Sequence, residues 1–187
     1  MMKSKLYAVA VLMVTLAHYT VVRASDHPLC KDIELVDIAN ATLVLGGDGS
    51  ITFRSGDACP ISIDDGAVEC RLRYKIESDK TLKMIDGERV RILKISRDVL
   101  SGSGYSEFLH AYICGEWGVL RIYSYEYDGG FNIAQNTQGQ LVIGSPVWKQ
   151  NDPHCCPTLH RTQTLGWDSK TRTFTKVADE VEERRGR

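Results

Sequence analysis

The chain has 187 residues, with 23 Lys and Arg against 24 Asp and Glu, so its formal net charge is −1. It lacks the excess of basic residues that is typical of nucleic-acid binding, and its basic residues are scattered along the chain. Where Arg71, Arg73 and Lys75 alternate with apolar neighbours, they indicate the solvated face of a strand. We therefore expect no nucleic-acid partner, and the length fits one domain.

The first residues have the pattern of a secretory signal. Lys3 and Lys5 precede an apolar run over residues 6–16, and small side chains at Val22 and Ala24 mark a cleavage point. The apolar run spans about a dozen residues, fewer than the roughly 20 needed to cross a bilayer. We predict cleavage after Ala24, which makes residues 1–24 a signal peptide and leaves no membrane span. The 163 remaining residues then carry 20 basic and 24 acidic side chains, a net charge of −4.

The cysteine content indicates an oxidising destination. All the cysteines follow the predicted signal, and an even number of cysteines in an exported chain is typical of disulfide bonds. No C-x-x-C pair occurs, which argues against a thioredoxin-type centre or a zinc ribbon. We expect a periplasmic or extracellular protein held by disulfides. The six candidates are Cys30, Cys59, Cys70, Cys114, Cys155 and Cys156.

Much of the chain alternates apolar and polar residues with a period of two, which is typical of strands with one buried face. The clearest predicted strand covers residues 71–77, where Leu72, Tyr74 and Ile76 share one face. Residues 41–54 are predicted to form a hairpin, because glycines near its centre permit the positive φ angles of a tight turn.

Asp86-Gly87 predicts a second hairpin, because this pair between two apolar stretches is a strong turn signal. Its strands cover residues 81–85 and 88–95. Further turn residues follow at intervals of about ten residues, which is typical of an antiparallel sandwich or barrel. The later predicted strands are 119–127, 131–134, 140–148, 162–167 and 171–177.

These patterns predict a mostly β fold, an antiparallel sandwich or small barrel built from short hairpins and stapled by disulfides. Residues 25–177 form one β-rich domain, because no linker or repeat interrupts them. Residues 178–187 are almost entirely polar. We expect them to form a C-terminal tail that is frayed or briefly helical.

Residues 148–158 differ from the rest of the chain because Pro153 and Pro157 bracket Cys155 and Cys156. Proline restricts both its own φ angle and the residue before it, so this segment is expected to be stiff. In an extended backbone the two thiols point in opposite directions, which favours bonds to two different cysteines elsewhere. A bond between the two neighbours is a second interpretation. The third is a copper(I) or zinc site built from soft ligands; its candidates are His154, Cys155, Cys156, His160 and Asp152.

The run from Asp152 to Pro157 resembles the D-P-x-C-C-P signature of small exported bacterial proteins and lipoproteins, the LppP/LprE-like group. The similarity covers residues 139–175, including the strand that ends at Gly166-Trp167-Asp168. It implies a secreted envelope protein and carries no known activity. Lipoprotein members have a lipidation cysteine, whereas here His27-Pro28-Leu29 precedes Cys30, so we expect a released domain.

The sequence offers no recognisable combination of a nucleophile, a base and a group that would orient the base. The serines near residue 102 lack the G-x-S-x-G spacing of a hydrolase nucleophile. Glu107, Glu116 and Glu126 have no identifiable carboxylate partner for glycosidase chemistry. We therefore predict a protein that is not an enzyme and that has no cofactor.

Tyr123, Tyr125 and Tyr127 fall on one face of a predicted strand and form a candidate binding face, because tyrosine is enriched at interfaces. The alternative is that they pack inside the fold. The leading hypothesis is an exported, non-catalytic domain that binds an envelope or extracellular macromolecule, as an inhibitor or accessory factor. The alternative hypothesis is a metal- or redox-active periplasmic protein that uses His154, Cys155 and Cys156.

Overall fold

The computed structural model describes residues 30–64, 67–100, 102, 104–153 and 155–183. Within these ranges the helical segments are short 3-10 turns, and none is long enough to cross a membrane. They are η1 (Ile33–Leu35), η2 (Ile38–Asn40) and η3 (Gly46–Asp48). The predicted signal peptide lies outside the described residues.

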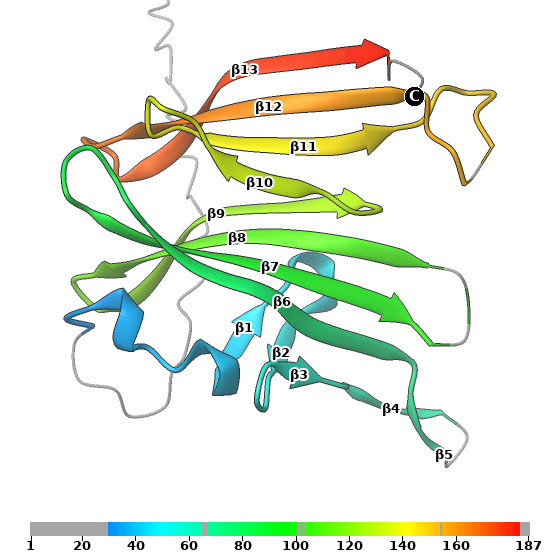
Figure 1. Ribbon diagram of the computed structural model, residues 1–187. Helices are drawn as coiled ribbons and strands as arrows, with labels where there is room; N and C mark the ends of the chain where they lie inside the picture. The colour runs from blue at the N-terminus through cyan, green and yellow to red at the C-terminus, as the bar shows by residue number, and fades with distance from the viewer. Residues whose placement is uncertain (1–29, 65–66, 101, 103, 154, 184–187) are drawn as a thin grey trace, which may run out of the picture.

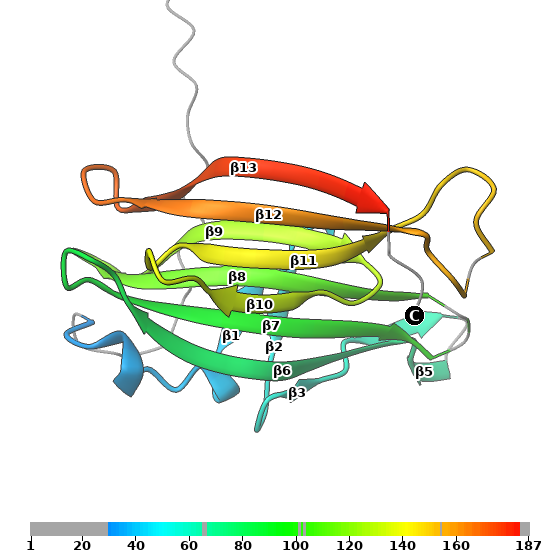
Figure 2. The same ribbon diagram turned by 45° about the horizontal axis from the view of Figure 1, so that its top comes forward.

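Two antiparallel sheets face each other, one with strand order β3-β6-β7-β8-β9 and one with order β10-β11-β12-β13 (Figures 1 and 2). The predicted mostly β, disulfide-bonded sandwich is confirmed. The strands of the larger sheet are β3 (Asp57–Ala58), β6 (Leu72–Lys83), β7 (Arg89–Val99), β8 (Tyr105–Gly115) and β9 (Gly118–Asp128). Those of the smaller sheet are β10 (Asn132–Gln135), β11 (Leu141–Val147), β12 (Leu159–Asp168) and β13 (Thr173–Glu183). Short ladders join β1 (Thr42–Val44) to β2 (Ser50–Thr52) and β4 (Ile61–Asp64) to β5 (Ala67–Cys70).

Both predicted hairpins are present. The first pairs β1 with β2 and turns at Gly49, which has φ +79°; the second pairs β6 with β7 and turns at Gly87, which has φ +87°. The predicted strands 71–77 and 81–85 are one strand, β6, with a register shift between Ile76 and Ser78. The hairpin of β6 and β7 is therefore much longer than the turn signal alone indicates.

The centre of the larger sheet is buried on both faces, which divides the core into two clusters. One face of β8 packs Phe108 and Tyr112 against residues 30–53, which we call the N-terminal segment. Its other face packs Leu109, Ala111 and Ile113 against the smaller sheet. A strand covered on both sides has no polar face, which explains why β8 shows no alternation in the sequence.

The chain changes sheets between β9 and β10. Gly129, with φ +80°, follows β9, and Phe131 enters the core between the two sheets. Strands that are neighbours in the sequence here therefore belong to different layers, and the described residues form no ladder between them.

The N-terminal segment is fastened to the outer face of the larger sheet. Cys30 is bonded to Cys114 at the end of β8. The Arg91 guanidinium donates to the carbonyl oxygen of Ile33 at 2.9 Å and to that of Val36. It also bonds to Asp79 on β6 at 2.7 Å, so one side chain joins two strands to the 3-10 turns.

Strand β13 corrects the predicted C-terminal tail. It runs to Glu183 and pairs with β12 along its length, with Arg161 bonded to Asp179 at 2.7 Å. The expectation of a frayed or helical segment is wrong for residues 178–183, because their backbone pairs with β12 and an edge strand tolerates this many charged, exposed side chains. Residues 184–187 lie outside the described residues.

His110 on β8 is fully buried, and one of its ring nitrogens, Nδ1, lies 2.8 Å from the hydroxyl oxygen of Tyr112. Burial lowers its pKa to about 3, and the nearby positive charge of Arg121 acts in the same direction. An unfolded histidine has a pKa of about 6.5. Between these two values the unfolded chain binds a proton that the folded chain does not bind.

Stability should therefore fall as the pH drops below about 6.5, by up to roughly 1.4 kcal/mol per pH unit from this residue alone. Urea unfolding at about pH 7 and at about pH 5 measures this loss of stability. Both pH values lie above the range in which most carboxylates become protonated. His110→Gln is expected to lose less stability between the two conditions than the wild type. Equal losses in both proteins would show that His110 is not the source.

Candidate functional site

One end of the sandwich gathers η1 and the turns that follow β6, β8 and β12 (Figure 1). The turns at 84–88 and 115–118 lie side by side because β7 and β8 are neighbours in the larger sheet. The turn at 169–172 is joined to both, since Arg172 donates to the carbonyl oxygen of Cys114 at 2.8 Å and pairs with Glu88 at 2.9 Å. We call η1 and these turns the hairpin end.

Three large apolar side chains are exposed at the hairpin end, each on a different segment. Leu35 is 82% exposed, Ile85 93% and Trp117 83%, whereas the next most exposed large apolar side chains among the described residues reach 55%. A single exposed apolar residue is ordinary, but several at one end of a fold are typical of an interaction surface. No packing within the sheets requires them there.

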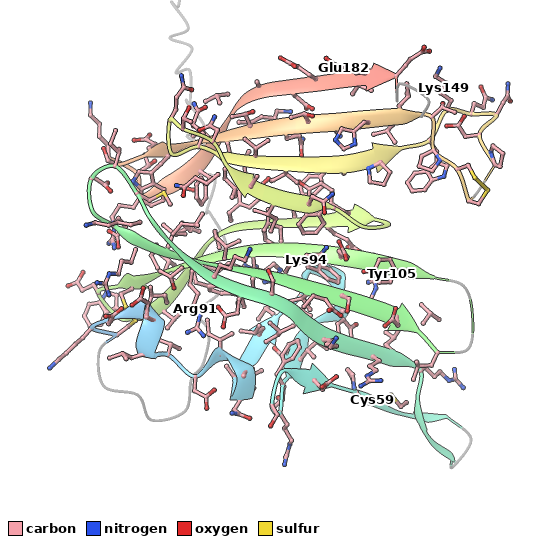
Figure 3. All side chains as sticks on the ribbon, in the orientation of Figure 1. Cys59, Arg91, Lys94, Tyr105, Lys149 and Glu182 are labelled. Atoms are coloured by element: carbon pink, nitrogen blue, oxygen red, sulfur yellow. A yellow bond between two sulfur atoms is a disulfide. The ribbon has the colours of Figure 1, made fainter. Side chains whose placement is uncertain are left out.

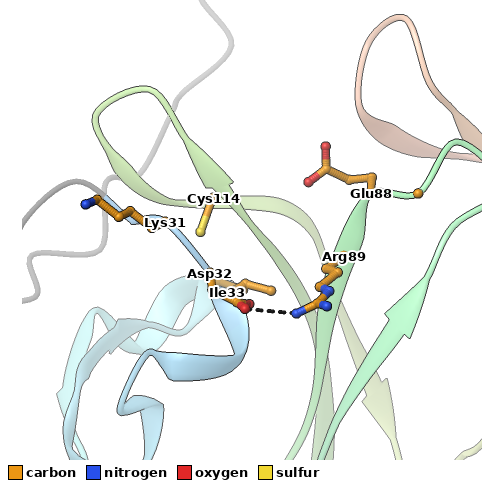
Figure 4. A pocket seen from close by; sticks show the side chains of 7 residues that line it. Lys31, Asp32, Ile33, Glu88, Arg89 and Cys114 are labelled. Atoms are coloured by element: carbon orange, nitrogen blue, oxygen red, sulfur yellow. Dashed lines mark hydrogen bonds and ion pairs between the residues drawn. The ribbon is translucent and has the colours of Figure 1, made fainter.

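A cleft of about 420 Å³ lies at the hairpin end, between the N-terminal segment, the start of β7 and the end of β8 (Figure 4). Arg89 pairs with Asp32 at 2.8 Å and with Glu34 at 3.0 Å, so part of the charge is neutralised within the site. The lining is polar and carries both signs of charge. It consists of Lys31, Asp32, Ile33, Gly87, Glu88, Arg89 and Cys114.

Covalent and polar bonds hold the hairpin end in place. The disulfide between Cys30 and Cys114 fixes the residues before η1 to the end of β8. The indole N–H of Trp167 donates to Asp86 at 2.8 Å and lowers the pKa of that carboxyl. Since Asp86 adjoins Ile85, this bond anchors the turn that carries the exposed side chain. The three exposed apolar side chains are therefore carried by segments whose backbone is held in place.

The tyrosines of β9 are used mainly for packing between the sheets. Tyr127 is buried and donates to Gln163 on β12 at 3.0 Å, and Tyr123 contacts Phe174 on β13 edge to face. Tyr125 is partly exposed and lies against Tyr127, with ring centroids 4.3 Å apart. The structure thus places this candidate binding face largely inside the sandwich, because β9 of the larger sheet packs against β12 and β13 of the smaller sheet.

All six candidate cysteines are paired, as Cys30–Cys114, Cys59–Cys70 and Cys155–Cys156. The expectation that Cys155 and Cys156 reach two different partners is wrong, because they are bonded to each other. The backbone is not extended here: the N–H of Cys156 donates to the carbonyl oxygen of Pro153 at 2.9 Å and forms a turn. The alternating directions of an extended strand do not apply to a turn.

The candidate metal ligands that the structure describes are not assembled into a site. The sulfurs of Cys155 and Cys156 are bonded to each other, so neither offers a thiolate. His160 is half-buried on β12 opposite Pro146, and His154 lies outside the described residues. Within the described ranges, no group of three or more His, Cys, Asp or Glu side chains could hold a metal ion.

The hairpin end was not predicted from the sequence, although two signals were present. Ile85 directly precedes the Asp86-Gly87 turn, and Trp117 lies within Gly-Glu-Trp-Gly. A large apolar side chain in a tight turn cannot reach the core of its own sheet.

Comparison with protein-family models, with curated proteins and with solved structures finds no match to this chain.

Proposed function

We propose that this chain is an exported, non-catalytic domain that binds a protein partner through the hairpin end. The observation that carries the proposal is the exposure of Leu35, Ile85 and Trp117 on three separate, anchored segments. Interfaces combine apolar and aromatic anchors with a polar rim, and tryptophan is enriched among the residues that dominate binding energy. The charges at Lys31, Glu88 and Arg89 provide the polar part of this surface.

The proposed location is the periplasm or the extracellular space. Its supports are the signal-like residues 1–24, the resemblance of residues 139–175 to LppP/LprE-like proteins, and three disulfides, which persist in oxidising compartments. The partner is then a protein of the envelope or of the surrounding medium. The domain acts on it by occupying a surface, as an inhibitor or accessory factor.

A pair of matched variants tests the binding surface. Ile85→Ser with Trp117→Ser removes two anchors from the hairpin end, and Leu100→Ser with Val181→Ser removes two exposed apolar side chains elsewhere. A partner is first captured from the extracytoplasmic fraction with the wild type and then purified. Its dissociation constant is measured with each protein by calorimetry.

The hairpin-end variant is expected to bind about 30-fold more weakly or worse, since losing an anchor costs 2 kcal/mol or more. The control variant should bind like the wild type. Thermal unfolding of both variants should stay within about 2 °C of the wild type, because exposed sites contribute little to stability. Wild-type affinity in the hairpin-end variant would contradict the proposal.

A further inference from the structure

The loop between β11 and β12 carries a disulfide on the outside of the molecule, away from the hairpin end (Figures 1 and 3). Cys155 and Cys156, which form it, are both exposed. The turn between β12 and β13 belongs to the hairpin end, and this loop lies at the other end of β12. The loop is therefore separated by the length of β12 from the proposed binding surface.

This disulfide does not staple the fold. A disulfide stabilises mainly by restricting the unfolded chain, and the restriction grows with the number of residues enclosed. Cys30–Cys114 spans a separation of 84 residues and Cys59–Cys70 one of 11, whereas Cys155 and Cys156 are adjacent. Opening the adjacent pair releases no distant segment of the chain.

Adjacency also makes this bond easier to reduce than the other two. Disulfides without strain have Cα atoms about 4.4 to 6.8 Å apart, and shorter spacings store strain that favours reduction. The Cα atoms are 5.2 Å apart in Cys30–Cys114 and 5.7 Å apart in Cys59–Cys70. In Cys155–Cys156 the chain itself holds them at 3.8 Å.

The loop keeps its shape through bonds that do not involve the sulfurs. The carboxylate of Asp152 accepts the backbone N–H groups of Lys149 and Thr158, each at 2.8 Å, and the hydroxyl of Thr158 at 2.9 Å. These bonds close the base of the loop. The ammonium group of Lys149 pairs with Glu183 at the end of β13, at 2.6 Å. The sulfurs can therefore be separated while the loop remains attached to the smaller sheet.

We propose that Cys155–Cys156 is an exchangeable disulfide that is reduced by a protein dithiol and later reoxidised. A thiolate of the donor attacks one sulfur, the S–S bond breaks, and a mixed disulfide forms. The second thiol of the donor then attacks the donor's own sulfur in that mixed disulfide. A disulfide forms within the donor, and the cysteine of this chain is released as a thiol. Two electrons and two protons pass to Cys155 and Cys156, which become thiols. A disulfide-bearing oxidant reverses the same steps.

The two exposed disulfides provide a matched comparison within one molecule, because Cys59 and Cys70 are exposed like Cys155 and Cys156. The folded mature protein is incubated with a reduced dithiol protein of the thioredoxin class. Free thiols are alkylated at intervals and located by peptide mass spectrometry. We expect Cys155 and Cys156 to be alkylated at least tenfold faster than Cys59 and Cys70, with the near-ultraviolet circular dichroism unchanged.

A second experiment traps the mixed disulfide on the adjacent pair. A donor that lacks its second cysteine cannot resolve the mixed disulfide, so it should remain bound to Cys155 or Cys156. The variant Cys155→Ser/Cys156→Ser should trap none of this donor while it keeps the wild-type fold. Reduction of Cys59–Cys70 at an equal or higher rate would overturn the proposal, as would loss of tertiary structure when the adjacent pair opens.

Discussion

Replacing both Cys30 and Cys114 by serine is expected to lower the free energy of unfolding by about 4 to 5 kcal/mol, the largest change from any disulfide in the chain. The bridge spans a separation of 84 residues, and its loss frees the unfolded chain over that whole length. In the folded state it holds the N-terminal segment against the core cluster that contains Ile33 and Ile38.

Urea unfolding measures the change, and thermal unfolding should shift down by roughly 10 to 18 °C. Cys155→Ser/Cys156→Ser is the matched control, because it removes the same number of cysteines and encloses no loop. We expect the control to lose less than about 1 kcal/mol. Equal losses in the two variants would contradict the assignment of the stapling role to Cys30–Cys114.

The second large effect is expected at Glu107, where the change to alanine should lower the free energy of unfolding by about 3 to 5 kcal/mol. Glu107 is only 3% exposed, and its carboxylate lies 2.8 Å from the ammonium nitrogen of Lys94 and 2.7 Å from the backbone nitrogen of Phe131. It also accepts the hydroxyl of Tyr105. Its removal leaves a buried N–H unsatisfied and a largely buried ammonium group without its carboxylate.

Glu183→Ala is the control, because Glu183 also pairs with a lysine but has a side chain that is 79% exposed. An exposed ion pair contributes little to stability, because water screens the two charges. Glu107→Gln should fall between the two, because the amide oxygen can still accept the N–H of Phe131. Urea unfolding of the three variants gives the order. A Glu107→Ala protein as stable as the Glu183→Ala protein would refute the role of the buried carboxylate.

The fold class was predictable because strands with one solvated face alternate and turns have their own residue chemistry. Residues 71–77 and the Asp86-Gly87 turn both lie where the sequence placed them. Strand β8 was not predicted: from Ser106 to Tyr112 every residue is buried, so no polar face marks its period. Strand β13 extends further than predicted because its charged residues lie at an edge.

The candidate sites depended more on tertiary structure. The sequence indicated that six cysteines form disulfides, but their pairing depends on which segments the fold brings together. The tyrosines of β9 share a face in either interpretation, and only the position of β13 decides that most of this face is covered. The hairpin end joins η1 to turns that are far apart in the sequence.

By itself, the sequence determined the strand periodicity, the hairpin turns and the disulfide-bonded character of this protein, because these properties arise from neighbouring residues and from composition. Tertiary structure alone decided which strands share a sheet, which cysteines pair, and that Leu35, Ile85 and Trp117 lie at one end. The physical reason is that these contacts join segments far apart in the chain. They depend on how the two core clusters pack, and no local pattern records that packing.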